Sequence, residues 1–242
     1  MLLSLEDVSI SFGGLMAVNN LSLTIGEGEI LGLIGPNGSG KTTAFNLITG
    51  FLKPDSGKIL LNGKDITGLK PPSICANGVA RTFQLVKPFP HLTALQNVMV
   101  GRLYGRSPSK TIHQAQEECE RILDFVGLAG KRDLLAKSLT LVDRKRLELA
   151  RALAGKPQLL LLDELMAGLN PTETDSAMQL IKSIRDSGIT VIMVEHIIKA
   201  VLGLCDRIVV LNAGEKIAEG PPQEIVSNQR VIEAYLGKAR HA

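Results

Sequence analysis

The chain has 242 residues, of which 45% are hydrophobic, enough for a sizeable core in one large domain or two small ones. Its 27 basic and 24 acidic residues leave a net charge of +3 without a long run of one sign, which predicts neither a nucleic-acid partner nor an anionic-membrane patch. Aromatic residues make up only 3% of the chain, too few to stack single-stranded bases.

The cysteines and the charges near the N-terminus indicate the cellular compartment in which the chain is expected. Cys75, Cys119 and Cys205 are odd in number and lack a C-x-x-C spacing, which favours reduced core thiols over a disulfide framework or a zinc site. Glu6 and Asp7 stand where a secretory signal would carry basic residues, and no apolar run approaches the roughly 18 residues of a membrane span. Membrane association is therefore expected to come through other proteins.

The first third of the chain is expected to be rich in strands. Apolar residues alternate over 3–10, 21–25 and 29–34, and glycines separate these runs. Asn62-Gly63 lies between two further short runs and favours the positive φ angles of a tight turn. The pattern predicts a β-hairpin at this dipeptide.

A phosphate-binding loop is predicted at residues 35–42, which match G-x-x-x-x-G-K-[ST] between an apolar strand and a helix-like segment. The alternative is a glycine-rich turn with a chance lysine, and the flanking strand and helix argue against it. Successive amide N–H groups at a helix start can bind phosphate. Lys41 is expected to reach the β- and γ-phosphates of ATP, and the Thr42 hydroxyl to bind Mg²⁺. The ATP-binding residues predicted from this loop are Gly35, Pro36, Asn37, Gly38, Ser39, Gly40, Lys41, Thr42 and Thr43.

Helical spacing replaces alternation between residues 92 and 153, with apolar residues at Ile112, Ala115, Cys119, Ile122 and Val126. Short apolar runs then return at residues 158–162 and 189–194, separated by a helical stretch. Such runs are typical of strands buried on both faces of a parallel sheet. The sequence thus predicts an α/β core with a helical insert.

Two carboxylates follow the buried run of leucines. A carboxylate at the end of a buried strand is costly unless a cation lies beside it. Asp163 is therefore predicted to bind Mg²⁺, and Glu164 to orient or deprotonate the attacking water. An Asp-Glu pair that merely starts a solvated turn is the alternative, and the phosphate loop makes it less attractive.

With these motifs the chain resembles the ATP-binding-cassette family over nearly its whole length. The resemblance implies an α/β P-loop nucleotide-hydrolase core with an antiparallel β subdomain and a helical insert subdomain. It places the catalytic core with the C-terminal helices in residues 1–84 and 155–242, and the helical subdomain in residues 85–154. The cofactors it implies are ATP and Mg²⁺.

Other residues take their expected roles from this resemblance alone. Phe12 lies where the family stacks an aromatic ring on adenine, Gln84 where a glutamine senses Mg²⁺ and the lytic water, and His196 where a histidine donates to the γ-phosphate. Lys41, Gln84, Glu164 and His196 are thus the expected catalytic set, and Thr42, Gln84 and Asp163 the expected Mg²⁺ ligands. Asn170 stands in the loop that touches the opposite subunit, where many members carry Asp.

The family signature, usually Leu-Ser-Gly-Gly-Gln, is degenerate here. It aligns with Leu139 and the segment Thr140, Leu141, Val142 and Asp143, ahead of a helix expected over residues 144–154. Val142 replaces a glycine whose amide approaches the ATP of the opposite subunit, and its β-branched side chain resists close approach. Asp143 is expected to bring a negative charge towards the γ-phosphate of that ATP. A plain helix start is the alternative reading.

Within the family, the chain is most similar to ATPase subunits of branched-chain amino-acid importers, and related lipopolysaccharide exporters share several motifs. Residues carrying this likeness include 11–14, 80–84, 147–151, 167–171 and 231–237. The resemblance implies transmembrane permease subunits, a second ATPase and, indirectly, a substrate-binding protein. The degenerate signature favours a second ATPase of different sequence, and the charge pattern predicts no nucleic acid. Val86 and Phe89 are expected to lie on the surface that receives a permease helix. The expected location is the cytoplasmic face of the membrane. An exporter ATPase and a weakly active regulatory subunit remain alternatives.

Overall fold

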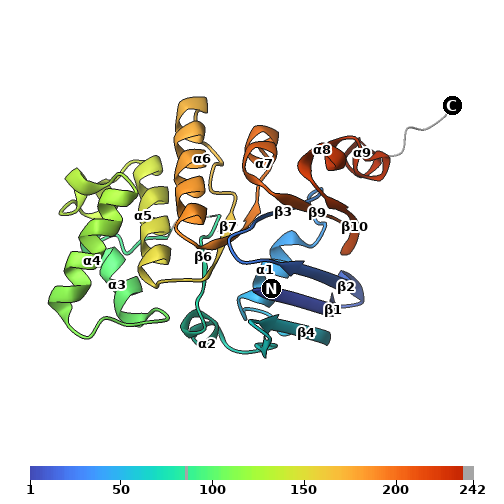
Figure 1. Ribbon diagram of the computed structural model, residues 1–242, viewed down its shortest axis with the longest axis horizontal. Helices are drawn as coiled ribbons and strands as arrows, with labels where there is room; N and C mark the ends of the chain where they lie inside the picture. The colour runs from blue at the N-terminus through green and yellow to red at the C-terminus, as the bar shows by residue number, and fades with distance from the viewer. Residues whose placement is uncertain (85–86, 237–242) are drawn as a thin grey trace. The chain divides into compact units, whose positions relative to one another are not determined.

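The computed structural model describes residues 1–84 and 87–236, which divide between two compact units (Figure 1). The first unit contains Met1–Pro71 and Ile181–Ala242, and the second contains Pro72–Leu180. The predicted α/β class, with an antiparallel part and a group of helices, is confirmed. The assignment of residues 1–84 and 155–242 to a core and 85–154 to a helical subdomain stays a prediction.

An antiparallel sheet forms part of the first unit. Its strands are β1 (Leu3–Phe12), β2 (Leu15–Ile25), β4 (Ser56–Leu61) and β5 (Lys64–Asp65), in the order β2-β1-β4-β5. In the last pair Leu60 lies opposite Asp65 and Leu61 opposite Lys64, so the predicted hairpin at Asn62-Gly63 is confirmed. Asn62 adopts φ 51° and Gly63 φ 73°, as a tight hairpin turn requires.

A second set of strands in the first unit supports the phosphate loop. β3 (Ile30–Ile34) runs parallel to both β8 (Thr190–Val194) and β9 (Arg207–Asn212), and β10 (Glu215–Gly220) pairs antiparallel with β9. Helices of this unit are α1 (Lys41–Ile48), α7 (Ile198–Leu204), α8 (Pro222–Val226) and α9 (Gln229–Leu236). Every residue of β8 is buried, which accounts for its almost wholly apolar sequence.

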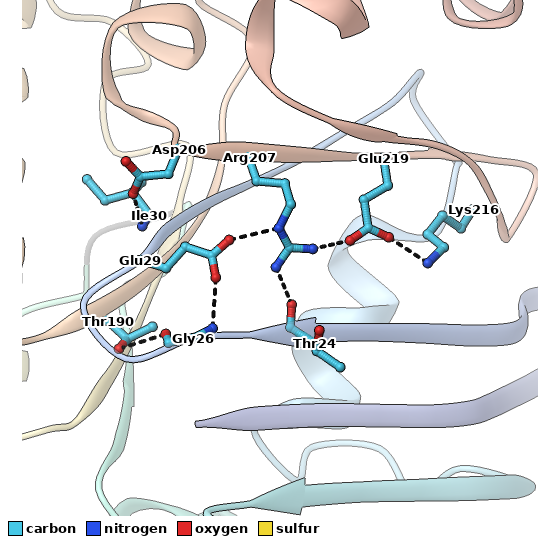
Figure 2. A network of polar contacts seen from close by, with 9 residues as sticks. All are labelled: Thr24, Gly26, Glu29, Ile30, Thr190, Asp206, Arg207, Lys216 and Glu219. Carbon is cyan, nitrogen blue, oxygen red and sulfur yellow. Dashed lines mark hydrogen bonds and ion pairs between the residues drawn. The ribbon is translucent and has the colours of Figure 1, made fainter. Parts of the chain in front are cut away.

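Arg207, at the start of β9, ties β2 to the strands that carry the phosphate loop (Figure 2). Its guanidinium donates to Glu29 Oε1 at 2.9 Å and to the Thr24 carbonyl at 2.5 Å, and it also pairs with Glu219 on β10. Glu29 in turn accepts from the Gly26 N–H at 2.7 Å. Charge-assisted bonds of this kind fix orientation as well as adding stability, so the turn before β3 is held in place.

The second unit joins a strand pair to a set of helices. β6 (Val79–Arg81) runs parallel to β7 (Leu159–Asp163), which is buried throughout. Helices α3 (Ala94–Tyr104), α4 (Ile112–Phe125) and α5 (Leu141–Ala154) pack on one another (Figure 1). The unit also contains most of α2 (Pro71–Ala76) and of α6 (Pro171–Asp186), and two short 3-10 helices at Ala129–Lys131 and Ala136–Ser138.

The helical spacing predicted from Ile112 onward is confirmed by α4, whose buried residues are Ala115, Cys119 and Leu123, while Ile112 at its first position is 61% exposed. Two other expectations about local structure are wrong. Cys75 is only half-buried, unlike Cys119 and Cys205. The helix expected over residues 144–154 begins three residues earlier, at Leu141. Within residues 1–84 and 87–236, no helix combines the length and the hydropathy needed to cross a bilayer.

Candidate functional site

The loop between β3 and α1 has the backbone form that a phosphate cradle needs. Gly35 has φ 150° and Gly40 has φ 103°, both in the region that favours glycine. A Cβ atom would lie 2.1 Å from the Leu211 carbonyl oxygen at Gly35, and 2.6 Å from the Ala17 carbonyl oxygen at Gly40. The loop is also anchored by the Gly214 N–H, which donates to the Ser39 carbonyl at 3.1 Å. No other residue type fits either position.

Lys41 is the cation of this loop. Its side chain is buried at the start of α1, and Nζ donates to the carbonyl oxygens of Gly35 at 2.8 Å and Pro36 at 2.9 Å. Nζ also lies 3.4 Å from Ser39 Oγ. The loop therefore surrounds an ammonium group with oxygen acceptors, and a phosphate oxygen suits the same donor. This arrangement fits the triphosphate of ATP.

The remaining predicted residues of the first unit are accessible. Phe12 ends β1 and is 47% exposed, as a ring that stacks on a base must be. Thr42 is exposed and Thr43 half-buried in the first turn of α1, next to Asn37 and Gly38, which are exposed at the tip of the loop. His196 is exposed two residues after β8. His91 and His113 are also exposed, whereas His241 lies outside the described residues.

The second unit brings the predicted glutamine and glutamate together. Gln84 Nε2 donates to Glu164 Oε2 at 2.8 Å, although the two residues are 80 positions apart in sequence. Beside them the Arg81 guanidinium pairs with Asp163 Oδ2 at 2.7 Å, and Thr82 Oγ1 accepts from the Asp163 N–H at 3.3 Å. Three side chains from residues 81–84 thus contact the acidic pair that ends β7. The phosphate loop and His196 belong to the other unit.

Glu164 occupies an unusual backbone conformation. Its φ is 49°, a left-handed angle that is uncommon for a residue with a Cβ atom and often marks a functional position. The turn is held by Lys145, a buried side chain of α5 whose Nζ donates to the Leu165 carbonyl at 2.7 Å and the Glu164 carbonyl at 3.4 Å. The strained turn directs the carboxylate of Glu164 to Gln84.

The signature segment forms the first turn of α5. Thr140 is the N-cap, and its Oγ accepts from the Asp143 N–H at 3.2 Å. Leu141 is exposed, and Val142 is half-buried beside a cavity of about 20 Å³, with Leu149, Leu165 and Leu169 among its lining residues. The next helix, α6, starts with a reciprocal cap in which Asn170 Oδ1 accepts from the Glu173 N–H at 2.9 Å and Glu173 Oε2 from the Asn170 N–H at 2.9 Å.

The expectation that Asp143 brings a negative charge towards the ATP of the opposite subunit requires correction. Asp143 is 5% exposed, and its Oδ2 accepts from Lys131 Nζ at 2.6 Å and from Thr140 Oγ at 2.8 Å. Burial acts to raise the pKa of this carboxyl, but the bonds from Lys131 and Thr140 outweigh it and lower the pKa below its ordinary value. The carboxylate is therefore neutralised inside its own unit and is not presented as a bare negative charge.

Glu148 is a buried acid that the motif analysis missed. It lies on α5, is 4% exposed, and its Oε1 accepts from the Phe83 N–H at 3.1 Å. Its Oε2 has no hydrogen-bond partner in the part of the chain that the structure describes. Burial raises the pKa of Glu148 to about 7, against the opposing effect of the Phe83 N–H. An acidic residue within the run Leu147-Glu148-Leu149-Ala150 was the available signal.

This raised pKa predicts a pH-dependent stability. Between the unfolded pKa of about 4.5 and the folded pKa of about 7, the unfolded chain releases the proton first, so stability falls as pH rises through that range. Glu148→Gln keeps an acceptor and cannot ionise, and it should therefore be more stable than the parent above pH 7 by up to about 3 kcal/mol. Urea unfolding from pH 5 to 8 measures the difference, with Glu6→Gln at an exposed site as control. A pH-independent difference would contradict the prediction.

Comparisons with known proteins agree with this geometry. A family model described as "ABC transporter" matches residues 18–167, and one described as "Branched-chain amino acid ATP-binding cassette transporter" matches residues 215–241. The high-affinity branched-chain amino acid transport ATP-binding protein LivG of Escherichia coli is 42% identical, with 98% of each chain covered.

Solved structures extend the likeness to the fold. The ADP conformation of the cassette MJ1267 has a TM-score of 0.89 at 33% identity, covering 98% of this chain and 99% of that one. A dimeric structure of the bacterial cassette MJ0796 has a TM-score of 0.81 at 27% identity, covering 91% and 98%. The predicted resemblance, over nearly the whole length, is confirmed by matches that cover 98% of this chain.

Proposed function

This chain belongs to the ABC transporter family of ATP-binding proteins, and on that premise we propose that it hydrolyses ATP to power uptake of branched-chain amino acids. The observation that carries the substrate class is the alignment with LivG across 98% of both chains, together with the C-terminal match to a branched-chain amino-acid model. The chain is thus a transport ATPase, and what we propose is the identity of the transported substrate. The transported amino acid would contact the membrane partners and not this chain, because an ATPase subunit of this family supplies only the energy.

Each of the candidate site residues has its own proposed role in ATP hydrolysis. Lys41 binds the β- and γ-phosphates, and Phe12 stacks on the adenine. Glu164 deprotonates or orients the attacking water, Gln84 positions that water and senses Mg²⁺, and His196 donates to the γ-phosphate. The Gln84–Glu164 hydrogen bond of 2.8 Å supports the pairing of the two groups. Such groups act by positioning and by stabilising charge on the transferred phosphoryl group.

Mg²⁺ is the proposed metal. It commonly binds few protein oxygens and completes its shell with waters and substrate phosphates. The Thr42 hydroxyl, the Gln84 side-chain oxygen and the Asp163 carboxylate are oxygen donors of the required kind. Asp163 is buried and forms its ion pair with Arg81, so a positive charge already accompanies this carboxylate. When bound, Mg²⁺ would neutralise charge that develops on the phosphates.

The partners are proposed from the family. A second ATPase would pair head to tail with this chain, and the dimeric MJ0796 cassette supports pairing as such. Permease subunits would hold the pair at the cytoplasmic face of the membrane and, together with a substrate-binding protein, handle the amino acid. Phe89, 46% exposed, belongs to the expected permease-facing surface, whereas Val86 lies outside the described residues.

Affinity purification of this chain from its own membranes tests the assignment, with every co-purifying subunit identified by mass spectrometry. We expect two permease subunits and an ATPase of different sequence. Recovery of the chain with no integral membrane protein would contradict a transport role, and recovery with lipopolysaccharide-export components would replace the proposed cargo.

Val142 gives a prediction for the second ATPase. If the Val142 side chain blocks close approach to the partner's ATP, Val142→Gly should raise the ATPase activity of the isolated chain by at least about tenfold, or roughly 1.4 kcal/mol of barrier. Glycine within a helix should also cost up to about 1 kcal/mol of stability. Val142→Ala is the matched control because it retains Cβ. Asp143 is left unchanged because it is bonded to Lys131. If the parent chain hydrolyses ATP rapidly and Val142→Gly does not change the rate, nothing at Val142 favours a second ATPase of different sequence.

A further inference from the structure

Three side chains on α5 hold the two loops that carry Gln84 and Glu164. We name Lys145, Glu148 and Arg151 the α5 polar face, since a spacing of three residues places them along one side of the helix. Lys145 Nζ donates to the Leu165 carbonyl at 2.7 Å, Glu148 Oε1 accepts from the Phe83 N–H at 3.1 Å, and the Arg151 guanidinium lies 3.3 Å from the Lys87 carbonyl.

The contacts fall on both sides of Gln84. Glu148 fixes the backbone one residue before it, and Arg151 fixes the backbone three residues after it, with its guanidinium also 5.5 Å from the centre of the Phe89 ring. Gln84 then donates to Glu164 at 2.8 Å. Two hydrogen bonds and the peptide bond between Phe83 and Gln84 therefore link Glu148 to Glu164.

Burial of Glu148 needs an explanation beyond packing. An acid that is 4% exposed loses the hydration it would have in water, and a leucine or methionine would fill the same space at lower cost. Neither could accept a hydrogen bond from the Phe83 N–H. The charged groups that face Glu148 are Lys145 and Arg151 on its own helix and Asp163 at the end of β7. The acid is thus placed where its acceptor oxygen determines the position of a loop.

We propose that Glu148 is a positioning residue for hydrolysis: it fixes Phe83 so that Gln84 is held against Glu164. In this role Glu148 acts through Gln84 and not on the nucleotide or the attacking water itself. The same helix begins with the signature segment Thr140–Asp143, so α5 carries both that segment and the polar face that contacts the Gln84 and Glu164 loops. The inference rests on the proposed catalytic roles of Gln84 and Glu164.

A double-mutant cycle tests the inference in the assembled transporter, with turnover and ATP affinity measured for Glu148→Ala, Gln84→Ala and the double variant. We expect Glu148→Ala to lower turnover about tenfold with ATP affinity within about twofold of the parent, and Glu148→Gln, which retains the acceptor, to restore turnover to within about twofold. In the Gln84→Ala background, Glu148→Ala should have no further effect. Leu149→Ala, a buried neighbour on α5, controls for general loosening of the helix.

The outcomes distinguish a failure of the role proposed for Gln84 from a failure of the role inferred for Glu148. If Gln84→Ala leaves turnover unchanged, the proposed role of Gln84 fails. If Gln84→Ala lowers turnover and Glu148→Ala lowers it again by the same factor, Glu148 does not act through Gln84 and the inference is overturned. The inference is also overturned if Leu149→Ala lowers turnover as much as Glu148→Ala at equal or smaller loss of thermal stability, or if Glu148→Gln is as impaired as Glu148→Ala.

Discussion

Replacing Lys41 by alanine should weaken ATP binding by at least about a hundredfold, equivalent to roughly 2.7 kcal/mol. Two losses combine in this variant. The ammonium group that would meet the β- and γ-phosphates disappears, and a hydrogen bond to a charged group is worth about 1.5–3 kcal/mol. The bonds from Nζ to the carbonyls of Gly35 and Pro36 disappear as well, so the loop loses its internal support.

Equilibrium binding of a fluorescent ATP analogue measures this effect, and a thermal melt confirms that the variant is folded. Lys53→Ala is the matched control, because Lys53 is an exposed lysine of the same unit that has no proposed contact with the nucleotide. ATP affinity in Lys41→Ala within about threefold of the parent would show that residues 35–42 do not hold the phosphates.

Glu164→Gln should leave ATP binding intact and lower turnover by about 10²–10⁴, the usual contribution of a general base. The amide keeps the size of the side chain and retains an oxygen that can accept from Gln84 Nε2, as Glu164 does at 2.8 Å. The substitution therefore removes proton acceptance and little else. Such a split between affinity and turnover identifies a group that acts only on the chemical step.

Phosphate release under saturating ATP measures the turnover, and Glu173→Gln is the control for the same change at a glutamate whose contact is a helix cap. Steady-state hydrolysis by Glu164→Gln at the parental rate would eliminate Glu164 as the group that acts on water. An equal loss of affinity and turnover would assign it a binding role instead.

Local sequence patterns predicted the elements that local chemistry determines. The Asn62-Gly63 hairpin follows from the positive φ angles that these residues tolerate, and the phosphate loop from glycines that no other residue type can replace at positions 35 and 40. The short apolar runs at β7 and β8 are strands because their burial leaves no polar face. The start of α5 was predicted three residues late because Thr140, and not Asp143, caps the helix.

Tertiary contacts between distant segments could not be derived in this way. The pairing of Asp143 with Lys131 joins α5 to a short 3-10 helix, and nothing in the spacing of the two residues indicates it. Likewise Glu148 contacts a backbone N–H that is 65 positions away. The sequence predicts which residue types are suited to the chemistry, while the fold decides which neutral or charged partner each of them meets.

ATP-driven uptake in reconstituted vesicles tests the central claim most directly. The complex purified with this chain would be placed in proteoliposomes with Mg²⁺ and ATP on the side of the ATPase subunits, and with radiolabelled leucine and its binding protein on the other. We predict leucine accumulation that requires ATP and falls to background when the chain carries Glu164→Gln. Uptake that proceeds equally without ATP, or equally with Glu164→Gln, would contradict the claim that hydrolysis by this chain powers transport.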